Sequence, residues 1–578
     1  MAPTDQLQEV KIMLHGTAAS EGIGIGKVML IEEHSLEYTP RTVTDTEAES
    51  QRFKAAVDAF CYNTEKQAEN LRSSAGEKEA EILAGHIQII KDPYLSGEIE
   101  KLIADGQCAE SALEHMCDMF IAMFSAADDE LTKQRAADVR DIKSGVLGIL
   151  LGVNEIKVSD APKGTVLVAR ELTPSVTAGI VKENIAGIIT ETGGTTSHSA
   201  ILARALEIPA VLSVDGVASS LKNGDTVVVD GSEGAVIVNP DDNTVSEYSK
   251  KRDAFLAERK ELENYRGRET KSASGEVYEL FCNIGKPEDA VKAVDADGEG
   301  VGLFRTEFLF MDRTSIPTED EQFEAYKKAA LILKGKSLII RTLDIGGDKD
   351  IPYLGLEKEE NPFMGFRAIR YCLKNRELFK SQIKAILRAS AFGDVKIMFP
   401  LITTMDELRE GKKLVAECKA DLRNMDINFN ENIQVGVMVE TASAAVIADM
   451  LAKEADFFSI GTNDLTGYTM ACDRGNNDVS YLYSPLQPSV LRIIKRTIEC
   501  GVQNGISVGM CGEAAANKLM IPLLISFGLT EFSVSAPSVL NVRKIISTWT
   551  KEEADKVTAK VLEMSTQQEI VEYLKSVV

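Results

Sequence analysis

The chain has 578 residues, of which 44% are hydrophobic and 26% are charged, and its formal net charge is −25. This length predicts roughly four domain-sized units, and the composition excludes a fibrous or wholly disordered protein. The acidic charge argues against nucleic acid or an anionic membrane as a partner. Nine cysteines without a CxxC pair, and the lack of an apolar run of about 18 residues, predict a cytoplasmic protein with reduced thiols and no membrane span.

Two sequence patterns alternate in the first 240 or so residues. Residues 1–32 contain short strand-like runs with glycine turns, and similar β-rich runs return in 149–240. Between them, residues 33–148 are polar and acidic, with apolar residues at helical spacing. We therefore predict one α/β domain, made of the two outer segments, with a helical bundle inserted into it. Residues 241–265 are highly charged and are predicted to form a linker helix.

The segment 266–578 alternates strand-like runs with amphipathic helical patterns. Eight apolar runs fit the strands of a (β/α)8 barrel, at 278–283, 300–304, 337–344, 395–400, 434–440, 456–461, 506–512 and 531–535. The active site of this fold lies at the C-terminal ends of the strands. The residues that follow these runs are therefore expected to carry the chemistry.

Polar and charged residues follow these predicted strands. They are Arg305, Arg341, Glu440, Asn463, Asp464, Arg474 and Cys511. The carboxylates of Glu440 and Asp464 can hold one Mg²⁺ and leave positions for substrate oxygens. Three arginines can orient a phosphate and a carboxylate, and a thiol can exchange a proton. This set predicts a small, highly anionic substrate such as a phospho-carboxylic acid. The alternative is that the arginines and carboxylates form structural salt bridges with one another.

A second set of candidate residues lies in the α/β domain, in the run GIITETGGTTSHSAILARA. Gly193 and Gly194 let the backbone approach a ligand, and three hydroxyl residues follow them, before His198 at the start of a predicted helix. Hydroxyls and free N–H groups at a helix N-terminus form an anion site, where a histidine can accept a phosphoryl group. The alternative is that His198 only caps the helix. His86, in the helical insertion, either has a structural role or faces a partner.

These motifs resemble Enzyme I of the bacterial phosphoenolpyruvate:sugar phosphotransferase system. GGTTSHSAILARALEIPAV resembles the phosphohistidine motif of this family. GLFRTEFLFMDR, RTLDIGGDKDIPYLGLEKEENPFMGFRAIR, VGVMVETASA, FFSIGTNDLTGYTMACDRGN and GMCGEAA resemble its barrel motifs, in order. The resemblance covers essentially the whole chain. It implies an α/β fold, in which a phosphohistidine swivel domain with an inserted helical bundle precedes a C-terminal TIM barrel that binds phosphoenolpyruvate.

The resemblance also implies a role for each matched residue. His198 would carry the phosphoryl group on Nε2, and Cys511 would protonate the enolate to give pyruvate. The residues that would bind phosphoenolpyruvate are Arg305, Arg341, Asn463, Asp464 and Arg474, and those that would hold Mg²⁺ are Glu440 and Asp464. The helical bundle would dock the phosphocarrier protein HPr, which receives the phosphoryl group in the first step of sugar uptake. The barrel would form a homodimer.

The acidic residues near His86 are candidates for contact with HPr. They are Glu77, Glu79, Glu81 and Asp92, which would complement a basic patch on the carrier. The alternative is a solvated helix face. Many family members have Arg where this chain has Thr195, and Gln where it has Gly467. We expect these two departures to change rates rather than to abolish activity.

Two other functions stay open from the sequence. The first is a dikinase-like enzyme, which would need a nucleotide-binding domain, whereas the chain has no GxxxxGK[ST] loop. The second is a phosphoenolpyruvate sensor without catalytic activity. A sensor would have less need of Cys511 together with the carboxylates of Glu440 and Asp464.

Overall fold

A computed structural model describes residues 12–31, 36–74, 77–126, 130–153, 158–177, 179–194, 197–311, 313, 315–346, 351–473 and 476–578. The chain divides into two compact units, Met1–Arg259 and Lys260–Val578. All nine cysteines lie in the described ranges and are free thiols. Within these ranges, no helix combines the length and the apolar composition needed to cross a membrane.

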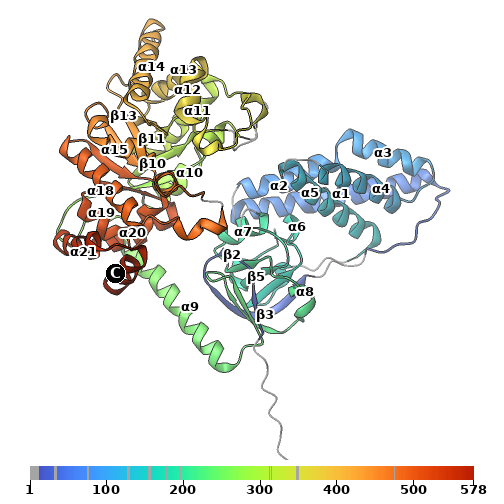
Figure 1. Ribbon diagram of the computed structural model, residues 1–578. Coiled ribbons are helices and arrows are strands. Elements are labelled where there is room, and N and C mark those ends of the chain that lie inside the picture. Colours follow the sequence, from blue (N-terminus) through green and yellow to red (C-terminus); the bar gives the residue numbers. More distant parts are fainter. Residues whose placement is uncertain are drawn as a thin grey trace, which may run out of the picture. The chain divides into compact units, whose positions relative to one another are not determined.

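The first unit contains an eight-stranded sheet whose strands come from both sides of a helical insertion (Figure 1). Its order is β1-β8-β7-β3-β4-β5-β6-β2. The strands are Ile12–His15 (β1), Thr17–Ser20 (β2), Ile23–Ile31 (β3), Thr165–Ala169 (β4), Ile185–Thr190 (β5), Ala210–Leu212 (β6), Thr226–Asp230 (β7) and Ala235–Val238 (β8). Strand β3 joins the two segments, because it pairs in parallel with β4 and antiparallel with β7. The short helices of this domain are Pro174–Thr177 (α6), His198–Ala205 (α7) and Val217–Ser220 (α8).

Strand β3 needs its glycines because other backbone segments pass close to it. A Cβ atom on Gly24 would lie 2.0 Å from the carbonyl oxygen of Ala186, and one on Gly26 would lie 2.0 Å from that of Gly164. No side chain fits at such distances. The alternating glycines therefore allow the close approach that builds this sheet.

The insertion is a bundle of five described helices, several of which run alongside one another in Figure 1. They are Thr46–Ser74 (α1), Glu77–Ile90 (α2), Pro93–Ala104 (α3), Ala109–Ser125 (α4) and Glu130–Leu151 (α5). Apolar residues at helical spacing form the core, as in α3, which buries Leu95, Ile99 and Ile103. The start of α3 is fixed by Asp92, whose carboxylate accepts hydrogen bonds from the backbone N–H groups of Tyr94 and Leu95.

The second unit is a closed barrel of eight parallel strands, in the order β10-β11-β12-β13-β14-β15-β16-β9. The strands are Glu279–Ile284 (β9), Gly300–Arg305 (β10), Ser337–Arg341 (β11), Val395–Phe399 (β12), Val435–Val439 (β13), Phe457–Ile460 (β14), Ser507–Met510 (β15) and Glu531–Val534 (β16). Each overlaps one predicted run. The predicted fold class, an α/β domain with a helical insertion followed by a (β/α)8 barrel, is confirmed.

Helices surround the barrel and connect its strands. The helix Asp242–Leu262 (α9) precedes it, where a linker helix was expected. The others are Asp289–Asp295 (α10), Glu319–Leu333 (α11), Ala368–Lys374 (α12), Arg376–Ala389 (α13), Met405–Asn424 (α14), Ala442–Val446 (α15), Ala448–Leu451 (α16), Thr462–Met470 (α17), Pro488–Gln503 (α18), Ile521–Phe527 (α19), Val539–Thr548 (α20), Lys551–Glu563 (α21) and Gln567–Val577 (α22). Four of them, α11, α14, α21 and α22, begin with a capping box, which satisfies N–H groups of the first turn.

A buried arginine on α20 ties the start of the second unit to the barrel. The guanidinium of Arg543 donates to the hydroxyl of Thr270 at 3.0 Å and to the backbone oxygen of Asp297 at 2.8 Å. It also pairs with the carboxylates of Asp297 and Glu299. The Arg543 side chain is only 2% exposed, so its charge depends on these partners.

Arg543→Met is therefore expected to lower the free energy of unfolding of the barrel by about 2–3 kcal/mol, because it removes charge-assisted hydrogen bonds to the half-buried carboxylates of Asp297 and Glu299. The single tryptophan, Trp549, ends α20, so its fluorescence during urea unfolding reports on this unit. Lys544→Met is the matched control. It removes an exposed pair with Glu261 and should cost roughly 0–1 kcal/mol. Equal losses in the two variants would contradict the structural role of Arg543.

Candidate active site at the barrel mouth

Barrel closure brings six of the predicted site residues to the C-terminal ends of the strands. Arg305 ends β10 and Arg341 ends β11, and the two residues are direct partners in the strand pairing. Glu440 follows β13, Cys511 follows β15, and Asn463 and Asp464 lie in the first turn of α17, after β14. The seventh, Arg474, lies outside the described residues.

Three carboxylates meet at this mouth. Asp344, Glu440 and Asp464 each offer an oxygen atom, and these atoms lie within 4.8 Å of one another. Asp344 and Glu440 are buried, 5% and 2% exposed. An all-oxygen set of this kind suits a hard divalent cation such as Mg²⁺. Asp344 was not among the metal ligands predicted from the sequence. Its position shortly after the strand β11 could have identified it, because the active site of a barrel lies at the strand ends.

The electrostatics of Glu440 follow from this crowding. Burial raises the pKa of Glu440 above its ordinary value, and the nearby charges of Asp464 and Asp344 raise it further. Arg341 and Arg367 act in the opposite direction. A cation among the three carboxylates would counteract this rise, because its positive charge favours the ionised form of each carboxyl group. The residues present therefore fit a divalent metal, which would hold all three carboxylates in their charged form.

Two buried arginines pair with these carboxylates. Arg341 donates to Glu307 at 2.5 Å and lies 3.2 Å from Asp344. Arg367 donates to Asp344 at 2.8 Å and lies 3.4 Å from Asp464. The structure thus adds Arg367, which sequence reasoning did not single out because it follows a loop instead of a strand. Arg367 lies in FMGFRAIR, at the end of one of the barrel motifs that resemble the family, and this position could have identified it as a site residue.

Arg305 differs from these two arginines. It is half-buried, and the described part of the chain offers it no ion-pair partner. The salt-bridge alternative therefore accounts for Arg341 and Arg367 but leaves the guanidinium of Arg305 for an external anion.

A chain of neutral hydrogen bonds fixes the strand ends that carry these groups. Gln382, on α13, is fully buried. Its side-chain oxygen accepts from the backbone N–H of Leu343 at 2.9 Å, and its nitrogen donates to Thr306 at 3.1 Å and to Tyr326 at 3.2 Å. The hydroxyl of Thr306 then donates to the backbone oxygen of Arg341 at 2.7 Å. One amide thus positions the ends of both β10 and β11.

Cys511 lies inside the mouth and is only 3% exposed. Its Sγ is 3.8 Å from the backbone oxygen of Ile460. Burial raises the pKa of Cys511 to about 11, although Ser459 and Arg341 lower it in part. The thiol is therefore protonated at neutral pH, which suits a group that donates a proton.

The second predicted site lies at the start of α7, which begins at His198. The N-cap is Ser197, whose hydroxyl accepts a hydrogen bond from the N–H of Ala200 at 3.3 Å, so the capping alternative for His198 is wrong. Gly193 has φ of 105°, which favours glycine. Thr195, Thr196 and the imidazole of His198 lie outside the described part of the structure.

The helical insertion differs from what its sequence predicted. His86 is 1% exposed, and its imidazole lies 3.4 Å from Asp138 and 3.7 Å from Asp141, so the expectation that it faces a partner is wrong. Asp92 is exposed and caps α3. The side chains of Glu77, Glu79 and Glu81, on α2, lie outside the described part.

Exposed apolar side chains on α3 and α4 of the insertion were not predicted. They are Tyr94, Met119 and Met123, which are 61%, 45% and 56% exposed. The ring of Tyr94 packs edge-on against Phe120, which in turn packs against Phe124. Met119 and Met123 are four residues apart and therefore lie on one face of α4. This spacing could have indicated an exposed apolar face from the sequence.

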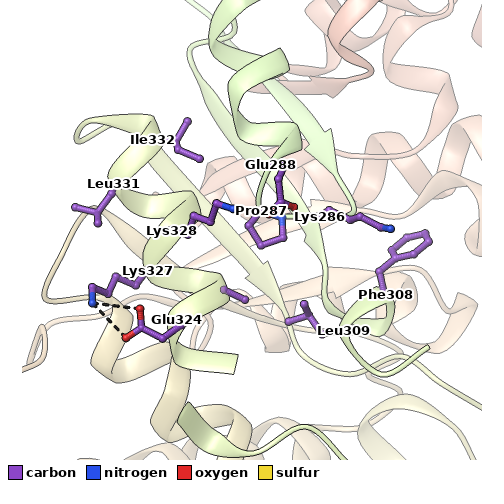
Figure 2. Close-up of a pocket in the computed structure, with 11 residues that line it drawn as sticks. Lys286, Pro287, Glu288, Phe308, Leu309, Glu324, Lys327, Lys328, Leu331 and Ile332 are labelled. Carbon is purple, nitrogen blue, oxygen red and sulfur yellow. Dashed lines mark hydrogen bonds and ion pairs between the residues drawn. The ribbon is translucent and has the colours of Figure 1, made fainter. Parts of the chain in front are cut away.

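A cavity of about 870 Å³ lies elsewhere on the barrel, between α11 and the segments that follow β9 and β10 (Figure 2). Apolar side chains such as Phe308 and Leu331 line it, together with lysines. Lys328 pairs with Glu288, and Lys327 with Glu324. None of the predicted site residues lines this cavity.

Comparisons with known proteins identify relatives over nearly the whole chain. The model of the PEP-binding domain of PEP-utilising enzymes matches residues 259–550. The models of their N-terminal and mobile domains match residues 15–135 and 161–234. The phosphoenolpyruvate-protein phosphotransferase of Bacillus subtilis (strain 168) is 46% identical over 570 residues, which are 98% of this chain and 99% of the relative. This chain belongs to the phosphoenolpyruvate-protein phosphotransferase family.

A second phosphoenolpyruvate-protein phosphotransferase agrees with this assignment. The phosphoenolpyruvate-protein phosphotransferase of Staphylococcus carnosus (strain TM300) is 43% identical over 97% of this chain and 98% of its own. An NMR solution structure of Enzyme I matches 42% of this chain and 99% of its own, at 37% identity and a TM-score of 0.38. The resemblance found in the sequence is therefore confirmed, and the protein is an enzyme of the transferase class.

The metal site can be tested with Mn²⁺, whose spectrum distinguishes bound from free ions. Glu440→Gln is expected to weaken Mn²⁺ binding at least about tenfold, because it removes one of three oxygen ligands. Electron paramagnetic resonance titration measures this change. Glu513→Gln removes an exposed carboxylate near the same mouth and should change the affinity by less than about threefold. Unchanged binding in Glu440→Gln would contradict the site.

Proposed function

We propose that the protein transfers the phosphoryl group of phosphoenolpyruvate to His198, releases pyruvate, and then phosphorylates a histidine of the carrier HPr. The observation that carries this proposal is the barrel mouth, which gathers a three-carboxylate set, a buried thiol and Arg305, an arginine without an ion-pair partner among the described residues. These groups match the chemistry of a substrate that carries a phosphate, a carboxylate and a carbon to be protonated. The family membership supports the same substrate.

The phosphate of phosphoenolpyruvate would bind to Arg305 and Arg341. Charge spreads over the phosphoryl oxygens in the transition state, so fixed cations contribute much of the rate acceleration. Arg341 is held in place by Glu307 and Asp344, which reduces the cost of ordering it when substrate binds. Asn463 and Asp464 on α17, and Arg474, complete the proposed substrate contacts.

Asp344, Glu440 and Asp464 would hold Mg²⁺, which neutralises negative charge on the substrate when bound. The bond from phosphorus to the bridging oxygen breaks as a bond to Nε2 of His198 forms. The enolate left behind takes the proton of Cys511 at its terminal carbon, which gives pyruvate. The protonated state of the buried thiol supports this role.

His198 suits its proposed role because α7 begins there. The free N–H groups and the dipole of a helix N-terminus favour a phosphate group attached at that point. His198 and the barrel mouth belong to different units of the chain. The proposed reaction therefore requires the α/β domain to move between the mouth and the carrier.

The helical insertion would dock HPr. The exposed side chains of Tyr94, Met119 and Met123 support this role, because protein interfaces are enriched in aromatic residues and methionine. Acidic residues such as Asp92 would add charge complementarity to a basic carrier. A homodimer formed through the barrel and a cytoplasmic location complete the proposal.

Incorporation of label from radiolabelled phosphoenolpyruvate, with Mg²⁺ and no nucleotide, tests this function. We expect acid-labile, base-stable label on the parent protein and none on His198→Ala, and HPr should discharge it. An absence of label in the parent would favour the phosphoenolpyruvate sensor. Label that appears only when a nucleotide is added would favour the dikinase-like enzyme.

The positioning role of Gln382 gives a second test. Gln382→Met preserves size but leaves the N–H of Leu343 without its partner, at a cost of about 1–3 kcal/mol. We expect the phosphoenolpyruvate concentration for half-maximal labelling to rise about tenfold, because the strand ends that carry Arg305 and Arg341 loosen. Gln568→Met, at an exposed position of α22, is the control and should leave that concentration unchanged. An unchanged value in Gln382→Met would contradict the role.

A further inference from the structure

A buried glutamate inside the barrel has no part in the proposed reaction. Glu531 begins β16 and is 6% exposed, and its Oε1 has no hydrogen-bond partner among the described residues. An unsatisfied buried carboxyl group is costly, so its presence requires an explanation. Two glycines make room for it. A Cβ atom on Gly302 would lie 2.4 Å from Oε1, and one on Gly509 would lie 2.8 Å from the carboxyl carbon.

Polar groups lead from Glu531 towards Cys511 along one side of the barrel interior. The same Cβ atom on Gly302 would lie 2.5 Å from the hydroxyl of Ser533, so this hydroxyl and the Glu531 carboxyl group border the same small space. Ser533 donates to the side-chain oxygen of Asn283 at 2.7 Å. The side-chain nitrogen of Asn283 donates to the backbone oxygens of Cys511 at 3.0 Å and of Ser533 at 3.2 Å. Ser533 and Cys511 are therefore neighbours across β15 and β16.

Apolar side chains line much of the opposite side of the interior, where the buried hydroxyl of Ser459 on β14 also lies beside Cys511 and Lys396 on β12 also acts on Glu531. Leu303, Ile339, Met398, Met438 and Phe457, from β10 to β14, cluster with Cys511. The polar groups on β9 and β16 lie on the side of the interior that carries Glu531, and they form a polar route towards Cys511. At the lower end of this route, Glu531 pairs in register with Glu279, which is exposed at the start of β9. Glu279 thus connects the route to solvent.

We propose that Glu531 returns the proton to Cys511 after each turnover, by a path from the N-terminal end of the barrel through Glu279 and Ser533. This inference rests on the proposed role of Cys511 as proton donor. The benefit is that the thiol is recharged from the side opposite to the mouth, where substrate and product exclude water. Glu531 is a positioning residue in this scheme, because it acts on the substrate only through Cys511.

The proton balance is simple. The S–H bond of Cys511 breaks as a C–H bond forms in pyruvate, which leaves a thiolate. The O–H bond of Glu531 then breaks, its proton passes by way of the Ser533 hydroxyl, and a new S–H bond forms. Glu531 recovers a proton from solvent beside Glu279. One proton from solvent is consumed for each pyruvate that is formed.

The charged surroundings of Glu531 agree with this role. Burial and, to a smaller extent, the charge of Glu279 raise the pKa of Glu531 to about 8, while Lys396 on β12 acts in the opposite direction. The charge of Glu531 in turn acts on the pKa of Cys511. Glu531 therefore holds a proton at neutral pH and loses it as the pH rises through about 8.

Burst kinetics in Glu531→Gln test the proposal. The first turnover, measured as label on His198 and as pyruvate, should proceed at the parent rate, because Cys511 starts protonated. Later turnovers with HPr should be at least about tenfold slower. Exchange of pyruvate methyl protons in D₂O, with Mg²⁺ present, should slow by a similar factor. In the parent, the rate of later turnovers should fall above about pH 8, because Glu531 then loses its proton. This fall should be absent in Glu531→Gln.

Two further variants separate the path from a structural effect. Ser533→Ala should slow later turnovers and spare the first, whereas Ser526→Ala, at the exposed end of α19, should change neither. A first turnover that is slowed as much as the later ones would overturn the proposal, because it indicates displacement of Cys511. Later turnovers within twofold of the parent would also overturn it. If the parent takes up no label, the proposed function fails instead, and the two failures are thereby distinguished.

Discussion

The barrel mouth depends on the balance of charge around Asp344. This buried carboxylate is paired with Arg341 and Arg367, and it lies within reach of the oxygens of Glu440 and Asp464. Three carboxylates in one pocket repel one another, and two arginines are too few to neutralise them and also bind an anion. A divalent cation would resolve this conflict. The metal site and the anion site therefore form one charge system, in which each part needs the other.

Neutral hydrogen bonds, and not further charges, hold this system in position. Gln382 connects the ends of two neighbouring strands through Thr306 and Leu343. A neutral amide can do this without disturbing the charge balance of the mouth, because its hydrogen bonds are directional and it carries no net charge. The arginines are thus oriented before substrate arrives, as preorganised catalysis requires.

The barrel interior combines an apolar cluster with polar groups, and this arrangement has a physical origin. Large side chains from β10 to β14 form the cluster, while Gly302 and Gly509 leave space for the carboxyl group of Glu531. Cys511 belongs to the apolar cluster and also has polar neighbours. Burial keeps its thiol protonated, and the polar neighbours are the groups through which the proposed proton transfer would run.

The sequence by itself determined the eight barrel strands, the helical insertion and the residues at the strand ends. Each of these depends on local periodicity, and parallel strands necessarily end at one rim. Tertiary structure alone decided which residues meet across that rim. Arg367 reaches Asp464, 97 positions away, and the carboxyl group of Glu531 packs against Gly302, because the barrel closes. His86 was misjudged for the same reason, since its burial depends on the packing of α5 and not on its own helix.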